Sequence, residues 1–238
     1  MLNISEILTK HRKEIIKNDF EYDLNNEEVY KQHSALICKI AQNYLNRENR
    51  KLIIDDNNKN VFRFLTYYFN GCRMCETIFE NENYSLNKNI LLIGAPGTGK
   101  TFIMQVFSDY LNLTKNHLYF KNISVTQMLN TQRLDGNINK YTYNEKASGN
   151  FEGNPYHFCL HDIGIERKVK QQSFGTDLQN VIDDFLFARY EIYQQQGIRY
   201  HLTSNLSVEE FEKYYQDRLL DRFKYFNVLV LDGESKRI

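Results

Sequence analysis

The sequence has no tryptophan, only 2 prolines and 4 cysteines among 238 residues, and no excess of charge of either sign. Its 30 basic and 30 acidic residues balance. This balance excludes a protein that coats nucleic acid by bulk electrostatic attraction, although it leaves room for a local basic patch. No apolar run approaches the roughly 18 residues that span a bilayer, and the first residues lack the apolar stretch of a signal peptide. We therefore expect a cytoplasmic protein without a membrane segment.

The few cysteines do not form the pattern of a zinc site or a disulfide framework. Cys38, Cys72, Cys75 and Cys159 are scattered, and only Cys72 and Cys75 have C-x-x-C spacing. A structural zinc site usually needs two such pairs, and the sequence has no second pair. A redox pair would stand at the start of a helix after a strand, whereas this one lies inside a helical pattern. We expect ordinary buried or half-buried thiols.

The chain length fits one ordinary domain with a small appendage. Residues 1 to about 50 carry apolar side chains at spacings of three and four, which is typical of helices, and the pattern resumes from Val61 to Phe79. Between them, residues 52–54 (Leu-Ile-Ile) are a candidate for a short strand. We expect a small, mainly helical N-terminal region over residues 1–80 and a second domain over residues 81–238.

From residue 89 onward, short apolar runs alternate with helical segments. Buried strands are expected at Ile90–Ile93, Leu118–Ile123, Tyr156–Ile163, Ile198–Thr203 and Phe226–Leu231, and helices at about 101–111, 124–132, 176–196 and 207–223. Strands that alternate with helices predict an α/β domain with a parallel sheet. Residues 133–154 are polar and rich in Gly and Asn, which predicts a surface excursion.

One run matches a nucleotide-binding motif in full. It is Gly94-Ala95-Pro96-Gly97-Thr98-Gly99-Lys100-Thr101, which has the form G-x-x-x-x-G-K-S/T and lies between a predicted strand and a predicted helix. Its glycines let successive backbone N–H groups turn inward around phosphates, and the positive end of the helix faces the same anion. Lys100 is expected to reach the β- and γ-phosphates, and the Thr101 hydroxyl to ligate Mg²⁺.

Two further predicted strands end in residues that suit the same chemistry. The run from His157 to Ile163 delivers Asp162 near its end, which makes Asp162 the candidate acid beside the metal. Many such enzymes have two adjacent acids there, and here the first position is His161. The next strand is followed by Asn205, whose amide is suited to bond both the γ-phosphate and the attacking water. An ordinary Asn turn is the alternative for Asn205.

Arginines suited to phosphoryl charge follow near the end of the sequence. Arg218 and Arg222 are four residues apart and therefore share one helical face, and Arg237 follows the last strand. Arginine is permanently cationic and presents a planar fork of donors, so it suits charge that develops in a transition state. The alternative for Arg218 and Arg222 is surface pairing with neighbouring aspartates.

In this order, the motifs GAPGTGKT, LHDIG, LTSN, DRLLDRF and GESKR resemble the AAA+ ATPases, and specifically their DnaC/IstB-like branch of helicase loaders and transposition helper ATPases. The resemblance covers residues 89–238 and, more weakly, residues 53–69. It implies a five-stranded parallel sheet with the P-loop strand central, no C-terminal lid domain, and ATP and Mg²⁺ as cofactors. It also implies that Arg222 is the finger that reaches a neighbouring subunit and that Arg237 is the second sensor.

His161 departs from the family pattern, because a neutral imidazole brings no negative charge to the waters around Mg²⁺. Either Asp162 takes over metal binding and the catalytic base is weaker, or hydrolysis is slow.

The resemblance implies an ATP-binding protein that loads or remodels a DNA replication or transposition machine and works as a homo-oligomer, with Arg222 acting in trans. Residues 1–80 would contact a replicative helicase or a transposase, and single-stranded DNA is a further candidate partner. A nucleotide-gated interaction protein with little hydrolysis is the first alternative, because of His161. A small-molecule P-loop kinase is the second, and Asn205 and the helix of Arg222 argue against it.

Overall fold

The computed structural model describes residues 23–80, 82–143, 154–168, 172–173 and 176–236. These residues form two compact units, which are described separately. The first takes in the described residues up to Asn87 together with Phe102–Tyr119, and the second takes in Lys88–Thr101 and the described residues from Phe120 onward. The predicted domain boundary at residue 80 stays a prediction.

The first unit is helical and rich in aromatic side chains. Its helices are α2 (Glu27–Leu45), α3 (Lys59–Phe69), the part of α4 (Lys100–Leu113) from Phe102 onward, and the short 3₁₀ helices η1 (Asn46–Glu48) and η2 (Arg73–Thr77). The Asn26 side chain caps α2 by accepting from the Glu28 N–H at 2.9 Å. The Phe107 ring of α4 lies 5.6 Å from the Phe69 ring and 6.1 Å from the Phe62 ring. Aromatic packing of this kind holds the unit together.

Two predictions for the first unit were wrong. The helix predicted from Val61 to Phe79 ends at Phe69, because Gly71 takes a φ of 70°, a left-handed conformation that commonly stops helices. Residues 52–54 form no strand. Side chains satisfy this backbone instead, since the Leu52 N–H donates to Gln42 Oε1 at 2.8 Å and the Ile53 carbonyl accepts from Asn58 Nδ2 at 2.9 Å. Residues 1–22 of the predicted helical region lie outside the described residues.

The cysteines are free thiols, of which Cys72, Cys75 and Cys159 are buried and Cys38 is half-buried. Burial raises the pKa of the Cys75 thiol to about 12. In the part of the chain that the structure describes, no three His, Cys, Asp or Glu side chains gather where they could hold a metal ion. No described helix is long and apolar enough to cross a membrane.

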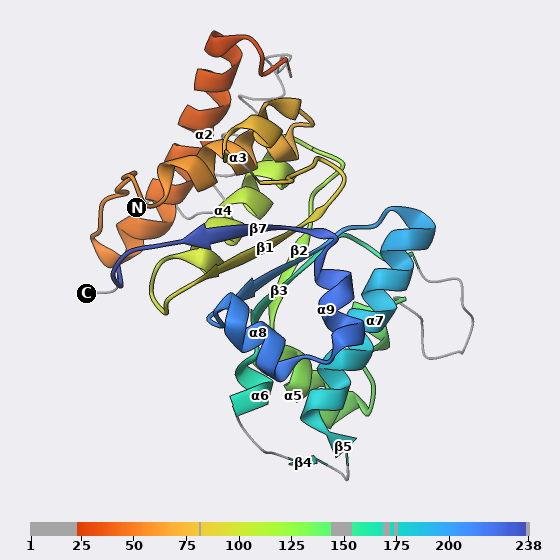
Figure 1. Ribbon diagram of the computed structural model, residues 1–238. Helices are drawn as coiled ribbons and strands as arrows, with labels where there is room; N and C mark the ends of the chain where they lie inside the picture. The colour runs from red at the N-terminus through yellow and green to blue at the C-terminus, as the bar shows by residue number, and fades with distance from the viewer. Residues whose placement is uncertain (1–22, 81, 144–153, 169–171, 174–175, 237–238) are drawn as a thin grey trace. The chain divides into compact units, whose positions relative to one another are not determined.

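The second unit is built on a parallel sheet of five strands in the order β2-β3-β6-β1-β7. Of these strands, β1, β2, β3 and β7 are labelled in Figure 1. The strands are β1 (Asn89–Gly94), β2 (Lys121–Ser124), β3 (Phe158–Ile163), β6 (Tyr200–Ser204) and β7 (Phe226–Leu231). All five strands were predicted, and β7 has the predicted bounds. The P-loop strand β1 lies inside the sheet between β6 and β7, and the middle place belongs to β6. The fold prediction of an α/β protein with a five-stranded parallel sheet is confirmed.

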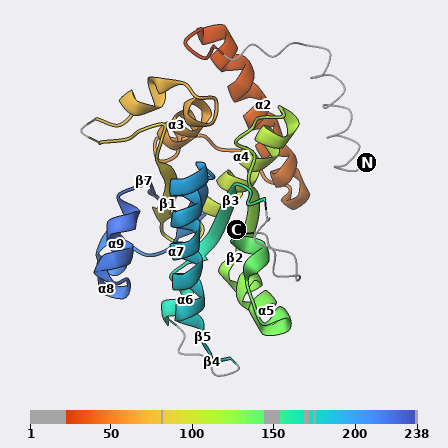
Figure 2. The same ribbon diagram turned by 90° about the vertical axis from the view of Figure 1, so that its right-hand side faces the viewer.

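One face of the sheet shares a core with the helices of this unit. These are α5 (Val125–Asp135), η3 (Asn139–Tyr141), α6 (Ile165–Lys168), α7 (Leu178–Gln196), α8 (Val208–Tyr214) and α9 (Asp217–Phe223), and β4 (Gln172–Ser173) and β5 (Thr176–Asp177) form a small separate hairpin. In Figure 2, α7 lies between α5 and α9. Buried residues from all five strands and from α5, α7, α8 and α9 form one hydrophobic cluster, which includes Leu91, Ile123, Phe158, Phe185, Leu202, Phe211, Leu219 and Phe226.

Two predicted segments differ from the structure in this unit. The helix predicted at 207–223 is split into α8 and α9, because Tyr215 has an extended backbone with φ −108° and ψ 141°. Ser207 starts α8 with a capping box that includes Glu210. The predicted surface excursion is only partly a surface feature, since Leu134 is 85% exposed while Tyr141 is buried. Residues 144–153 lie outside the described residues.

Candidate nucleotide-binding site

The glycine-rich loop lies between β1 and α4, as predicted. Two of its glycines are required by the geometry. Gly97 has a φ of 88°, and a Cβ there would overlap the Ser235 side chain. Gly99 has a φ of 101°, and no atom lies within 4 Å of the place where its Cβ would be. A side chain at Gly99 would therefore be strained, and it would fill a space that the loop leaves open.

Lys100 turns its side chain back into this loop. The residue is 4% exposed, and its Nζ donates to the carbonyls of Gly94 and Ala95, each at 2.8 Å. Because a buried ammonium group is costly without acceptors, these carbonyls hold the charge in place. Thr101 follows in the first turn of α4 and is half-buried. The positive charge of Lys100 and the positive end of a 14-residue helix are thus combined at one loop.

The chain after β7 returns to the same loop. The Lys236 N–H donates to the Gly97 carbonyl at 3.0 Å, and Ser235 lies against Gly97. The predicted second sensor, Arg237, lies outside the described residues.

The register of three strands brings the predicted residues to one edge of the sheet. Ser204 of β6 is paired with Ile93 of β1 on one side and with Ile163 of β3 on the other. Neighbouring strands lie about 4.8 Å apart. The P-loop after β1, Asp162 near the end of β3, and Asn205 after β6 therefore lie at the carboxyl edge, where parallel sheets of this kind bind ligands. Asn205 is exposed there.

His161 of β3 lies on one face of the sheet, with its ring between side chains of the neighbouring strands β2 and β6. Its Nε2 lies 2.9 Å from Asn122 Oδ1, and its Nδ1 lies 3.3 Å from Thr203 Oγ1. Burial lowers the pKa of His161 to about 4, so the ring is neutral near pH 7. Since Asn122 Oδ1 can only accept, Nε2 carries the proton and Nδ1 accepts from the Thr203 hydroxyl. Both ring nitrogens are thus bonded inside the protein, and the position contributes no negative charge.

Asp162 has an unusual backbone for a strand residue. Its φ is 62°, and the pairing of β3 with β6 shifts register between Leu160 and Ile163. A non-glycine residue in the left-handed region costs on the order of 1–3 kcal/mol and often marks a functional site. The Asp162 N–H donates to Thr203 Oγ1 at 3.1 Å. Thr203 therefore links the backbone of Asp162 to the ring of His161.

A buried carboxylate that the sequence does not predict, Glu166, lies just beyond Asp162. Glu166 Oε2 accepts from the Gly164 N–H at 2.8 Å, and its Oε1 accepts from the Tyr215 hydroxyl at 2.7 Å. Arg167 Nε lies 3.5 Å from Oε1, and the Arg167 guanidinium also pairs with Asp183 of α7. No local sequence pattern marks Glu166 as a buried residue, because its partner Tyr215 comes 49 residues later in the sequence.

Arg222 lies on aromatic rings of α7. Its guanidinium carbon is 4.5 Å from the centre of the Phe187 ring and 4.6 Å from that of the Tyr190 ring. Its Nη1 donates to the Arg218 carbonyl at 2.7 Å, and its Nε has no partner in the described residues. Asp221 pairs with Lys224 at 2.6 Å instead. Among the described residues, neither Arg218 nor Arg222 lies within 4.0 Å of a carboxylate as an ion pair, and both guanidinium groups lie over the Phe187 ring.

The parallel sheet of this strand order, with the P-loop after β1, is an α/β fold that solved structures share. No protein family model and no curated protein sequence matches this chain. In fold, the chain is similar to the crystal structure of the DnaC helicase loader, with 12% sequence identity and a TM-score of 0.51. That similarity covers 76% of this chain and 93% of the DnaC chain.

The chain is also similar to AMPPCP-bound DnaA from Aquifex aeolicus, with 17% identity and a TM-score of 0.49 over 78% of this chain. This chain spans half of the DnaA chain, since the match covers 50% of it. At 12% identity, the similarity to the DnaC structure concerns the fold alone.

Proposed function

We propose that this chain is a DnaC-like AAA+ protein that binds ATP and Mg²⁺ and uses them to load or remodel a DNA replication or transposition machine. The observation that carries the proposal is the P-loop between β1 and α4, with Lys100 buried among its carbonyls. The similarity of fold to the DnaC helicase loader supports the loading role.

The residues present fit a nucleotide with its metal ion. The open space at Gly99 and the N–H groups of the first turn of α4 suit phosphate oxygens, and the Lys100 ammonium suits their charge. Thr101 and Asp162 would hold Mg²⁺, which supplies charge neutralisation at the phosphates when it is bound. Oxygen ligands such as a hydroxyl and a carboxylate are those that Mg²⁺ prefers.

The remaining residues of the carboxyl edge would act on the attacking water and on developing charge. Asp162, with its constrained backbone, would orient the water, and the exposed Asn205 amide would bond the water and the γ-phosphate. Arg222 would act in trans on a neighbouring subunit, and Arg237 would act as a second sensor. Residues 1–80 would bind the replicative helicase or transposase, and single-stranded DNA is a candidate ligand of the oligomer.

A second function is a nucleotide-gated interaction protein that hydrolyses ATP very slowly. The neutral, fully bonded His161 favours it, because the position where a second carboxylate is usual carries no charge here. Both functions share the nucleotide site and differ only in the rate of turnover.

The test is calorimetry of ATP binding with Mg²⁺, followed by single-turnover hydrolysis, on the full chain and on Lys100→Ala. Loss of a charge-assisted bond costs about 1.5–3 kcal/mol, so ATP affinity should fall roughly 10- to 100-fold. Lys39→Ala, at an exposed position of α2, is the matched control and should bind as the natural chain does. Unchanged ATP affinity in Lys100→Ala would refute the proposal, and the measured turnover decides between the two functions.

A further inference from the structure

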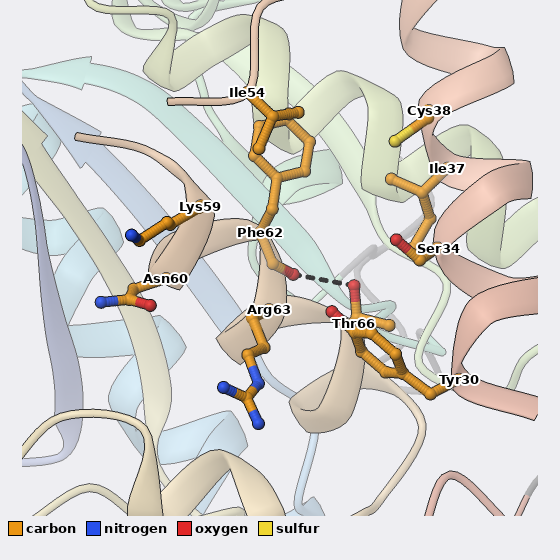
Figure 3. A pocket seen from close by; sticks show the side chains of 10 residues that line it. All are labelled: Tyr30, Ser34, Ile37, Cys38, Ile54, Lys59, Asn60, Phe62, Arg63 and Thr66. Carbon is orange, nitrogen blue, oxygen red and sulfur yellow. Dashed lines mark hydrogen bonds between the residues drawn. The ribbon is translucent and has the colours of Figure 1, made fainter. Parts of the chain in front are cut away.

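A cavity of about 260 Å³ lies between α2 and α3 within the first unit, far along the sequence from the P-loop motif. Tyr30, Ile37 and Cys38 of α2 form one wall, and Phe62, Arg63 and Thr66 of α3 form the other (Figure 3). Small-molecule sites usually occupy about 300–1,000 Å³, so this groove is below the size for a nucleotide or a cofactor. Its size suits one anchoring side chain of another protein.

The floor of the groove is apolar, and its rim is exposed. Ile37 and Phe62 are buried, and the Thr66 hydroxyl donates to the Phe62 carbonyl at 2.7 Å, so this polar group is satisfied (Figure 3). Ile54 also lines the groove and is 43% exposed, and its neighbour Ile53 is 63% exposed. Two adjacent exposed isoleucines beside an apolar groove are the pattern of an interaction surface.

The charge on the groove has one sign. Lys59 and Arg63 of α3 line it, whereas no carboxylate does. No carboxylate in the described residues forms an ion pair with Arg63. Lys59 pairs with Asp56 at 2.5 Å, but both side chains are largely exposed, and such surface pairs contribute little. The Arg63 guanidinium carbon lies 5.9 Å from the centre of the Tyr67 ring, and a partner's carboxylates could compete with these weak surface contacts for both cations.

We propose that this groove binds an acidic amphipathic segment of a partner protein, which inserts one apolar side chain between α2 and α3 and sets carboxylates against Lys59 and Arg63. The proposal deepens the proposed function and rests on its partner-binding role for residues 1–80. A second copy of this chain fits less well, because symmetric pairing of the groove with itself would bring like charges together.

The test is selection of peptides from a random 12-residue display library against the full chain, with ATP present. Selected peptides should carry Leu, Ile or Phe flanked by Asp or Glu. Their affinity, measured by fluorescence anisotropy, should fall at least 10-fold with Arg63→Glu and with Ser34→Trp, which fills the groove. Ala35→Trp, exposed on the same helix, and Lys213→Glu, in the second unit, are the matched controls and should bind normally.

Cys38 gives an independent readout. Alkylation of this half-buried thiol should block the selected peptides, and Cys38→Ser should bind them whether or not it is treated with the reagent. The proposal is overturned if no peptide is enriched, if the enriched peptides are basic, or if Ser34→Trp and Arg63→Glu bind them normally. Dimerisation of the natural chain that Ser34→Trp abolishes would assign the groove to a second copy instead. ATP affinity should be unchanged in these variants, so a failure of the groove is distinguishable from a failure of the nucleotide site.

Discussion

The Tyr215 hydroxyl donates to Glu166 Oε1 at 2.7 Å, and both residues are buried. Glu166 stands on α6, and its other oxygen accepts from the Gly164 N–H in the turn after β3. Tyr215 lies between α8 and α9 and has an extended backbone. This pair therefore joins the end of the strand that carries Asp162 to the start of the helix that carries Arg222.

Tyr215→Phe should destabilise the protein without removing a carbon atom from the core. Glu166 Oε1 would keep only Arg167 as a neighbour, and a buried acceptor that loses its donor costs about 1–3 kcal/mol. Urea unfolding should show this loss in the free energy of unfolding. Tyr214→Phe, at a half-exposed neighbour, is the control and should unfold as the natural chain does. Equal stability of the two variants would show that the bond between Tyr215 and Glu166 is unimportant.

The buried ring of His161 predicts a loss of stability in acid. Its pKa is about 4 in the folded protein and about 6.5 in an unfolded chain. Between these two pH values the unfolded state binds a proton that the folded state does not. The contribution of neutral His161 to the free energy of unfolding is therefore fully present above pH 6.5 and is lost as the pH falls towards 4. The full difference is about 3 kcal/mol, because one pKa unit corresponds to about 1.4 kcal/mol.

His161→Gln separates this contribution from those of other groups. The buried His201 also has a lowered pKa, because burial disfavours its charge, and it should add acid sensitivity of the same sign. The slope of stability against pH between 6.5 and 4 should therefore become shallower in His161→Gln but should not vanish. Urea unfolding at several pH values checks this expectation. An unchanged slope would mean that His161 is not kept neutral by burial.

His161→Asp should raise the rate of ATP hydrolysis. The new carboxylate would bring the missing negative charge near the metal, and the Thr203 hydroxyl could donate to it as it now donates to Nδ1. Asn122 would have to turn its amide so that the NH₂ group faces the carboxylate. Single-turnover hydrolysis is the measurement, with Asp162→Asn as the variant that should abolish turnover. A natural chain that is already fast, and slower after His161→Asp, would contradict this account.

The sequence predicts the strand, loop and helix around Lys100 because each of them depends on local patterns: an apolar run, glycines at fixed positions and a helical continuation. The break of the predicted 207–223 helix at Tyr215 has another origin. Tyr215 is buried, and its hydroxyl is bonded to Glu166, a residue 49 positions earlier in the sequence. Periodicity within one segment cannot show such a contact, and for the same reason Glu166 itself was missed.

The position of His161 illustrates the same limit at the candidate site. The missing acid is visible in the sequence, and so is the neutrality of an imidazole. The bonds to Asn122 and Thr203 depend on which strands lie on either side of β3, and that order follows from the whole sheet. Arg222 is similar, because its stacking partners Phe187 and Tyr190 lie on another helix.

If Arg222 acts in a neighbouring subunit, Arg222→Ala should leave ATP affinity nearly intact. It should remove the part of the hydrolysis rate that depends on assembly of the oligomer. To reach that subunit, its guanidinium must leave the rings of Phe187 and Tyr190, which costs about 1–2 kcal/mol at this half-buried position. An arginine finger in full action is worth about 10³–10⁵ in rate, because it neutralises charge that develops in the transition state. Calorimetry and hydrolysis at several protein concentrations measure the two effects separately.

Mixing two inactive variants distinguishes action in trans from action within one chain. Arg222→Ala keeps an intact P-loop, and Lys100→Ala keeps an intact arginine. In a mixed oligomer, some interfaces would pair the intact P-loop of one subunit with the intact arginine of the next, so part of the activity should return. Sedimentation of the mixture establishes that the two variants assemble together. If they assemble and no activity returns, Arg222 does not act in trans, and its contacts with the rings of α7 are then a structural feature of the single chain.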